Sequence, residues 1–306
     1  MSFKTMAAWL PLLAYASTAI AEVIDDDESS IEEVVVLGQS ISSELARIAV
    51  EKEPMVDTAV IFSRLPGADA NRNGPITGIA SYRGMFGDRV SVSIDGLGVI
   101  SGGPNSMDPP LSYVSPMITE ELVLERGIPG VASAPESIGG HVEATLARGD
   151  FGTQSRLGLS GMGGIRYSPN GDMSMTAARL TAANLEHRFS LVAEVDRADD
   201  FDTPSGTITP SGLSRDRYDL SYAYSDGKSD FLLFAGRLDT EDTGTPALPM
   251  DIIYIDTDIY GAQFSHQLAP SFSVSAKLGY NDVEHLMDNF ALRPPPSTPM
   301  QYRQNL

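Results

Sequence analysis

Two strand-and-turn segments in the first half of the chain decide the fold: residues 89–99, RVSVSIDGLGV, and residues 118–127, ITEELVLERG. In the first, apolar and small polar residues alternate up to an Asp-Gly pair, the pattern of a strand that enters a tight turn. The second runs through aliphatic residues into another glycine turn. The stretch between them contains residues 102–110, GGPNSMDPP, and is rich in glycine and proline. We therefore expect a long loop that projects from the end of the first strand.

Two helical patterns precede these strands. Residues 41–50, ISSELARIAV, have helical spacing, with Ser42 or Ser43 as the cap. Residues 56–67, VDTAVIFSRLPG, predict a second helix that is ended by its Pro-Gly pair. Together with the strands, these patterns predict one compact α+β unit over residues 40–147.

After Arg148 the pattern changes to alternating segments of about ten residues separated by turns, which is typical of a transmembrane β-barrel. A soluble β-sandwich would give the same alternation in any single strand. The connections favour the barrel, because short and long ones alternate along the chain, as in an up-and-down barrel with tight turns at one end. About seven strands are expected, near residues 154–166, 172–183, 187–197, 216–225, 229–238, 253–267 and 271–284.

The N-terminal residues 1–21 are typical of a secretory signal peptide. Lys4 precedes an apolar run that is too short to span a membrane, and a small-x-small pattern ends at Ala21. Residues 22–39 are expected to be disordered, because they begin with an acidic stretch that has few apolar groups. They also contain a β-branched run, residues 34–36. The pattern alone leaves open whether this run adds a strand to another protein's sheet or is the first strand of the next domain.

Charge and composition exclude several classes of function. The 306 residues carry 21 Lys and Arg against 41 Asp and Glu, a formal net charge of −20, which argues against nucleic acid as a partner. The chain has no cysteine, so an exported protein of this sequence is held together by burial or sheet closure and not by disulfides. The sequence contains no serine-hydrolase, zinc-protease or phosphate-loop motif, and we therefore expect neither catalysis nor an organic cofactor.

The chain resembles the TonB-dependent outer-membrane receptors. Residues 32–38, EEVVVLG, look like the family's TonB box; residues 82–99 look like the central plug segment, and residues 118–146 like the closing motif of the plug. The resemblance implies an α+β plug domain followed by antiparallel transmembrane strands of a 22-stranded β-barrel, incomplete here, whose N-terminal part is residues 148–306.

The resemblance also implies a location and a partner. It places the protein in the outer membrane of a Gram-negative bacterium, in contact with the membrane lipid. Transport would be energised by the inner-membrane TonB complex, whose periplasmic C-terminal domain binds the TonB box. This favours strand donation by the β-branched run, and the TonB-box residues are then Glu33, Val34, Val35, Val36 and Leu37.

Within the family the detail is similar to the copper-receptor branch. Those receptors carry a plug loop of the form Cys-Pro-Asn-x-Met-Asp-x-Pro and a His-x-Met pair on an early barrel strand. Here the pair is His285-Leu286-Met287, and Gly103 stands where the cysteine would be. The resemblance implies copper, as Cu(I), bound by Met107, His285 and Met287, and delivered as the free ion or by a copper carrier. The plug loop would be supported by Pro104, Asn105 and Asp108.

The chemistry of this trio agrees with the resemblance. Thioether and imidazole groups are soft and borderline ligands that suit copper and bind calcium or magnesium poorly. On an extended strand His285 and Met287 point to the same face, as shared coordination requires. Taken singly, His285 also fits a solvated loop histidine and Met287 fits packing. The other histidines, His141, His187 and His266, lack partners at ligand spacing and are expected to be structural.

Two questions remain open at the level of sequence. A 22-stranded barrel needs on the order of 400 residues beyond the plug, so the chain is expected to be a fragment of a longer receptor. The alternatives in function are a receptor for a siderophore or another metal chelate, and a truncated, non-transporting product that acts only as a TonB-interaction module.

Overall fold

The protein is described from a computed structural model, which describes residues 45–50, 57–99, 106–130 and 137–305. These residues all belong to one compact unit, Ser42–Leu306. The predicted signal peptide, the TonB-box residues and the loop positions Gly103, Pro104 and Asn105 lie outside the described residues.

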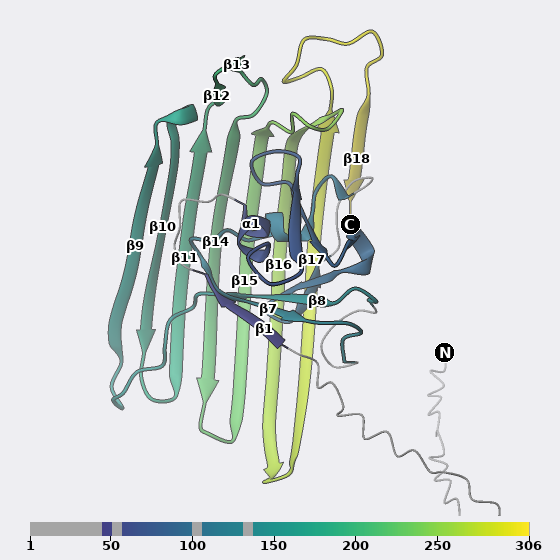
Figure 1. Cartoon of the computed structure of the whole chain (residues 1–306). Helices are drawn as coiled ribbons and strands as arrows, with labels where there is room; N and C mark the ends of the chain where they lie inside the picture. Colours follow the sequence, from purple (N-terminus) through teal and green to yellow (C-terminus); the bar gives the residue numbers. More distant parts are fainter. Residues whose placement is uncertain (1–44, 51–56, 100–105, 131–136, 306) are drawn as a thin grey trace, which may run out of the picture. The chain divides into compact units, whose positions relative to one another are not determined.

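A five-stranded sheet forms the centre of the first domain, which we call the plug (Figure 1). Its neighbouring strands are antiparallel except for one parallel pair, β5 and β8. In spatial order the strands are β1 (Leu45–Ala49), β7 (Thr119–Glu125), β8 (His141–Leu146), β5 (Ser91–Ile94) and β6 (Leu97–Val99).

The helix predicted over residues 41–50 is wrong where the structure describes it. Residues 45–49 form strand β1, whose side chains alternate between exposed and half-buried and which pairs antiparallel with β7. Arg47 reaches across to Glu121 at 2.9 Å. In so short a segment, pairing with the free edge of β7 outweighs a weak helical spacing, because helix propensity is only a weak prior.

The second predicted helix is confirmed but is shorter. Helix α1 (Thr58–Phe62) begins after Asp57, whose Oδ1 accepts a hydrogen bond from the backbone N–H of Ala59 at 3.0 Å. The chain leaves the helix at Ser63, before the predicted Pro-Gly stop, and enters a small three-stranded sheet. The strands of this sheet are β2 (Ala68–Arg72), β3 (Gly78–Tyr82) and β4 (Met85–Phe86), followed by the 3₁₀ turn η1 (Gly87–Arg89).

The predicted strand-turn-strand over residues 89–99 is confirmed. Asp95 and Gly96 both have positive φ, at 47° and 73°, which is the backbone of a two-residue hairpin turn between β5 and β6. The following segment differs from expectation, because its described part, residues 106–117, does not project. It includes the 3₁₀ helix η3 (Pro110–Tyr113) and is buried over most of its length.

The second half of the chain is an eight-stranded antiparallel meander, which we call the wall sheet (Figure 1). It does not close on itself, since β9 and β18 are its two edges. In chain order it contains β9 (Gly158–Ser168), β10 (Met173–Ala183), β11 (His187–Ala198), β14 (Leu213–Ser225), β15 (Ser229–Thr243), β16 (Asp251–Ala269), β17 (Phe272–Asp288) and β18 (Gln301–Asn305). The loops of this region carry η4 (Asn170–Asp172) and the pair β12 (Asp202–Thr203) and β13 (Gly206–Thr207).

The seven strands predicted here are confirmed, several with longer bounds, and β18 is an eighth that the sequence did not predict. Its residues, QYRQN, lack the apolar alternation by which the other strands were found. No helix within the described residues has the length and apolar character needed to cross a membrane.

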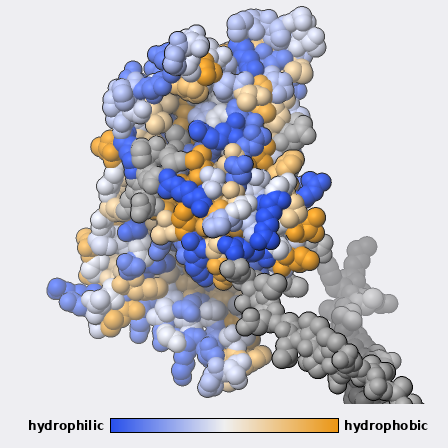
Figure 2. Space-filling view, in the orientation of Figure 1, coloured by the Kyte–Doolittle hydropathy of each residue, from blue (hydrophilic) through white to orange (hydrophobic). Residues whose placement is uncertain are grey.

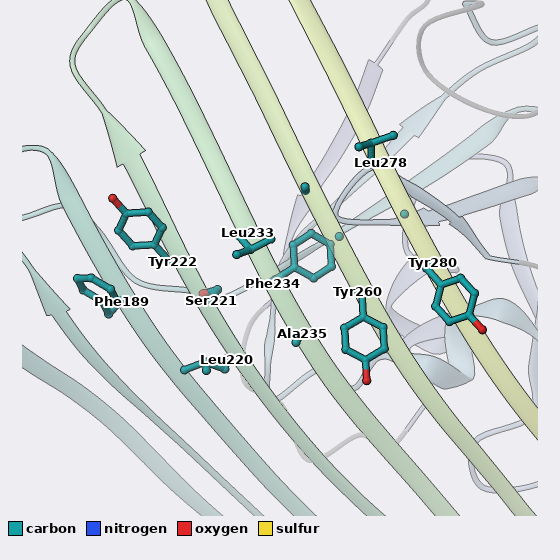
Figure 3. Close-up of a pocket in the computed structure, with 13 residues that line it drawn as sticks. Phe189, Leu220, Ser221, Tyr222, Leu233, Phe234, Ala235, Tyr260, Leu278 and Tyr280 are labelled. Carbon is teal, nitrogen blue, oxygen red and sulfur yellow. The ribbon is translucent and has the colours of Figure 1, made fainter. Parts of the chain in front are cut away.

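The two faces of the wall sheet differ in character. The outer face carries large apolar and aromatic side chains, and a hollow of about 590 Å³ lies on it (Figure 3). The side chains around the hollow include Phe189, Leu220, Tyr222, Leu233, Tyr260, Leu278 and Tyr280. The inner face packs against the plug, and on the plug side of the molecule hydrophilic residues are interspersed with hydrophobic ones (Figure 2).

Plug and wall sheet share one buried hydrophobic cluster, to which the inner face contributes side chains from β10, β11, β15, β16 and β17. The closest approaches use glycine. A Cβ at Gly279 of β17 would fall on Leu97 of the plug, and a Cβ at Gly261 of β16 would fall on the ring of Phe234 from the neighbouring strand. These two glycines face each other across the β16–β17 pair.

Candidate metal site between the plug and the wall sheet

The inward-facing residues at the end of β17 form one side of the candidate site. Val283, His285 and Met287 are buried, whereas Glu284 and Leu286 between them are half-buried. The two-residue period therefore places His285 and Met287 on the same face, as the sequence predicts. Tyr302, the residue paired with Met287 on β18, presents its ring to the His285 imidazole at 6.4 Å between centroids and 67° between planes.

The imidazole of His285 is the most unusual polar group of this region. It is 0 % exposed, and neither Nδ1 nor Nε2 has a hydrogen-bond partner. Buried polar atoms in native proteins are nearly always paired, and leaving one unpaired costs about 1–3 kcal/mol. Whichever ring nitrogen carries no proton can donate its lone pair to a metal ion, and the desolvation that binding normally demands is already complete.

Met107 forms the other side of the site from the plug. It is 3 % exposed and belongs to the same buried cluster as Met287. The sequence places Met107 in a loop that is expected to project, whereas it packs between plug and wall. The structure therefore brings Met107 and Met287 into one cluster, with His285 the next inward residue along β17.

Asp108 fixes the loop that carries Met107. Its carboxylate, 1 % exposed, accepts hydrogen bonds from the Tyr113 hydroxyl at 2.6 Å and the Ser112 hydroxyl at 3.1 Å. Burial raises the pKa of Asp108 to about 6, against the lowering effect of the two hydroxyl donors. Burial, together with the charge and hydrogen bond of Asp108, raises the pKa of Tyr113 well above its usual value. The expected support of the loop by Pro104 and Asn105 falls on residues outside the described ranges.

The donor set is sulfur with a single imidazole. Within the described ranges no group of three or more His, Cys, Asp or Glu is placed to hold a metal ion. The other histidines are engaged by hydroxyl groups: His141 with Ser91 and Ser93, His187 with Tyr222, and His266 with Ser229. They differ from His285 in this respect, which agrees with the structural role expected for them.

A cavity of about 210 Å³ lies between the plug and β17. Val283, two residues before His285, lines it on the wall side, and Tyr113 lines it on the plug side. Its remaining lining residues are Gly98, Val99, Thr257, Ile259 and Asn281. The cavity therefore lies between plug and wall on the inner face, and none of Met107, His285 and Met287 lines it.

Two buried arginines that the sequence analysis missed hold the same plug segment to the wall. Arg215 donates to the Asp196 carboxylate at 2.6 and 3.0 Å and to the carbonyl of Ser112 at 3.2 Å. Arg217 donates to the Asp219 carboxylate at 2.6 and 3.0 Å and to the carbonyl of Tyr113. We call the side chains of Arg215, Asp196, Arg217 and Asp219 the arginine clamp.

The hydroxyl of Ser115 extends this contact by donating to the carboxylate of Glu194. The signal for the clamp is present in the sequence. In residues 215–219, RDRYD, charged residues recur with the strand period on the face opposite the exposed Tyr218. Charges on the face away from the lipid, with burial behind them, indicate a contact with another part of the chain.

Comparison with known proteins gives the family. The family model described as TonB-dependent Receptor Plug Domain matches residues 37–141. Among solved structures, the copper transporter OprC superposes with a TM-score of 0.76 at 26 % identity, over 85 % of this chain and 41 % of that one. A search of curated proteins gave no match.

Two siderophore receptors share the fold at lower identity. The ferric enterobactin receptor PfeA of Pseudomonas aeruginosa superposes with a TM-score of 0.62 at 14 % identity, over 85 % of this chain and 44 % of that one. The siderophore receptor PirA of Acinetobacter baumannii superposes with a TM-score of 0.57 at 12 % identity, over 85 % of this chain and 43 % of that one. The chain spans less than half the length of each of these relatives.

The resemblance to the copper-receptor branch is therefore confirmed, and the family is one of receptors and not of enzymes. The open wall sheet corresponds to an incomplete barrel, as expected. Residues 37–141 match the plug domain of TonB-dependent receptors, and the described chain as a whole is similar to the plug and adjoining barrel strands of the copper transporter OprC.

Proposed function

We propose that the protein serves the uptake of copper across the outer membrane, and that Met107, His285 and Met287 bind the ion as Cu(I). The observation that carries this proposal is the buried imidazole of His285, which has no partner for either nitrogen and lies on the same inward face as Met287. The free-energy cost of burying this imidazole without a partner is offset once one of its ring nitrogens coordinates a cation.

The chemistry of the donors favours copper over harder ions. Thioether sulfur and imidazole nitrogen suit Cu(I), whereas calcium and magnesium require oxygen ligands. The copper transporter OprC also shares 26 % identity with this chain, against 14 % for PfeA and 12 % for PirA. The site is enclosed by apolar side chains, which suits a bare ion that has exchanged its water for soft ligands.

A receptor for a siderophore is the second candidate, because PfeA and PirA share the fold. Identities of 12–14 % carry the fold and nothing about the ligand. A ferric chelate is far larger than an ion and needs an open external surface, whereas Met107, His285 and Met287 are each at most 3 % exposed. The enclosed donors therefore favour the ion.

Energy for release is proposed to come from TonB. Glu33, Val34, Val35, Val36 and Leu37 would add a strand to the periplasmic C-terminal domain of TonB, which is how an isolated β-branched segment gains its missing hydrogen bonds. Deletion of residues 33–37 should then abolish uptake and leave copper binding unchanged. Loss of binding in this deletion, or uptake without these residues, would contradict the assignment. The same deletion tests the TonB-module alternative, in which neither copper binding nor copper uptake is expected.

The test of the copper proposal compares uptake of copper and of ferric siderophores by cells that express the protein at its natural length. A double variant, Met107→Leu with His285→Phe, should abolish copper accumulation measured by mass spectrometry. The matched control is His266→Gln, because His266 is hydrogen-bonded to Ser229 and is paired with Val274, towards the other end of the β16–β17 ladder from the His285 pair. Unchanged copper uptake in the double variant would reject the proposal, and uptake of a ferric chelate that depends on the protein would favour the alternative.

A further inference from the structure

The cavity of about 210 Å³ between the plug and β17 is lined by two buried polar atoms that have no partner. They are the hydroxyl oxygen of Thr257 on β16 and the side-chain carbonyl oxygen of Asn281 on β17, neither of which makes a hydrogen bond within the described residues. Buried polar groups in native proteins are nearly always paired, with protein or with ordered water. The cavity has room for several water molecules, at about 30 Å³ each, and such water would pair both atoms.

Both walls of the cavity lead to the proposed donor set. On the wall sheet Val283 lines the cavity, and His285 is the next residue of β17 on the same face. Residues that alternate along a strand are about 7 Å apart. On the plug Tyr113 lines the cavity, and its hydroxyl donates to Asp108, the sequence neighbour of Met107. The cavity is therefore one strand repeat away from the donors along β17.

Leu97 closes the cavity on the side away from His285. It precedes the lining residue Gly98 in β6 and packs with Phe234 and with Ile259, which also lines the cavity. Gly279 leaves the space that Leu97 occupies, since a Cβ there would fall on the leucine side chain. The contact is apolar and tight, so it separates the cavity from whatever lies beyond the hairpin.

A second cavity, of about 230 Å³, lies beyond Leu97 along the same two strands. Its polar lining residues include Gln263 of β16 and Lys277 of β17. Gln263 donates to the carbonyl of Asp95, and a Cβ at Gly96 would meet the Lys277 side chain, so both residues lie under the turn of the β5–β6 hairpin. Along β16 and β17 the order is thus a polar cavity, an apolar constriction and a second polar cavity.

The chemistry of the first cavity suits brief occupancy by a cation. Among the described residues that line it, none carries a charge, and the unpaired atoms are neutral oxygens. Neutral oxygen holds Cu(I) more weakly than sulfur or imidazole does. A site on a conduction path must bind an ion well enough to admit it and weakly enough to release it.

We propose that this cavity is a second station for the ion, a chamber in which water and the oxygens of Thr257 and Asn281 hold a hydrated cation after it leaves the sulfur donors. The inference rests on the proposed function. It assigns both oxygens to passage and not to tight binding, so their removal should slow uptake without lowering the affinity for Cu(I).

The first test compares Thr257→Val and Asn281→Leu with the wild type. Each change keeps a similar side-chain shape and removes an unpaired buried oxygen, so the fold should be retained. Copper uptake by cells that express the protein at its natural length should fall about tenfold in each variant. The Cu(I) affinity of the purified protein in detergent, measured by competition with a chromophoric Cu(I) chelator, should be unchanged.

The matched control is Thr181→Val, because Thr181 is a buried threonine of β10 that lines neither cavity, and its uptake should equal that of the wild type. Wild-type uptake in Thr257→Val and Asn281→Leu would overturn the station, while loss of uptake in Met107→Leu with His285→Phe still upheld the copper site. A lower Cu(I) affinity in Asn281→Leu would also overturn the station, since Asn281 would then belong to the tight site. No copper uptake by the wild type would overturn both proposals.

The second test measures water in the cavity and needs no copper. The sequence has no cysteine, so Asn281→Cys places a thiol at the cavity whose rate of reaction with a small water-soluble thiol reagent reports access of water. The control is Val142→Cys, at a position in the plug core that is 0 % exposed. We expect Asn281→Cys to react at least about tenfold faster than the control, and equal rates would show a dry cavity and overturn the station.

Discussion

Two contacts hold the plug segment of residues 106–115 against the wall sheet, and they are built from opposite chemistry. At β11 and β14 the arginine clamp pairs each guanidinium with a carboxylate and a plug carbonyl, and every member is at most 3 % exposed. At β16 and β17 the contact is made by Met107, Met287 and aliphatic side chains, next to an imidazole whose nitrogens are unpaired. In the first contact every buried charge has a partner, whereas in the second both imidazole nitrogens are left unpaired, and we propose that a copper ion completes it.

The difference separates anchoring from binding. Buried charges are tolerated only when they are paired, and such pairs resist change because breaking one leaves an uncompensated ion. Soft donors without partners cost less to bury and are ready for a cation. We therefore expect mutations in the clamp to act on stability, and mutations at the donor set to act on affinity.

The largest effect is expected from Arg217→Ala. It leaves Asp219, 3 % exposed, without its partner, and such losses cost about 3–5 kcal/mol. Thermal unfolding of the purified protein in detergent and proteolysis of the plug would measure the loss. The control is Arg237→Ala, which removes an arginine that is half exposed and paired with Asp239, and should cost at most about 1 kcal/mol. Equal effects of the two variants would remove the distinction between anchor and surface pair.

His285→Phe should separate affinity from stability most clearly. Phenylalanine fills the space and removes two unpaired nitrogens, so thermal stability of the metal-free protein should be unchanged or higher. Affinity for Cu(I) should fall by about 100-fold, or about 2.7 kcal/mol, because the only nitrogen ligand of the proposed site is lost. A large loss of stability without added metal would show that the imidazole has a structural role instead.

Asp108→Asn should reveal the cost of the buried carboxylate in the loop that carries Met107. The folded-state pKa of about 6 is raised above the ordinary value of 3.8, so the protonated form favours the folded state. The contribution of this group is therefore full below about pH 4 and is lost as the pH rises through 6.

At pH 4 the Asp108→Asn variant and the wild type should have the same free energy of unfolding. At pH 8 the variant should be more stable than the wild type by roughly 2 kcal/mol. Thermal unfolding at the two pH values measures it, with the exposed Asp88→Asn as the control. If the stability difference between the variant and the wild type did not grow with pH, burial would not raise the pKa of Asp108.

The smallest effect concerns the residue that departs from the family pattern. Gly103→Cys supplies a thiolate, the strongest soft donor, and should tighten Cu(I) binding by about tenfold, or about 1.4 kcal/mol. Competition with a chromophoric Cu(I) chelator would measure the affinity. Gly103→Ser is the control, with an oxygen in place of the sulfur. If both variants bound Cu(I) more tightly, the gain in affinity would come from a change in the loop and not from the added sulfur.

The wall sheet could be predicted well from the sequence because the alternation that defines each strand lies within the strand itself. Strand after strand alternates between side chains that face lipid and side chains that face the plug, and this period is visible without knowledge of the partners. β18 escapes because it is short and polar throughout. β1 escapes because the edge of β7, some 70 residues later, decides its conformation.

The candidate site is predicted only in part, since burial depends on contacts between distant segments. The residues Met107, His285 and Met287 were found through a family pattern and the alternation of β17. Their burial, the unpaired imidazole and the plug carbonyls that Arg215 and Arg217 contact could not be predicted, because each depends on packing between plug and wall across 100 or more residues of chain. The sequence shows that Arg, Asp and His side chains are polar, but it does not show which of them are buried against the other domain.

The paired glycines Gly261 and Gly279 imply how the wall can vary among related proteins. The ring of Phe234 occupies the space of a side chain at 261, and Leu97 of the plug occupies that at 279. A larger residue at either glycine therefore requires a smaller one at its partner. Across homologues we expect positions 261 and 234, and positions 279 and 97, to change together in size, so that the second pair records in sequence how closely the plug is seated against its barrel.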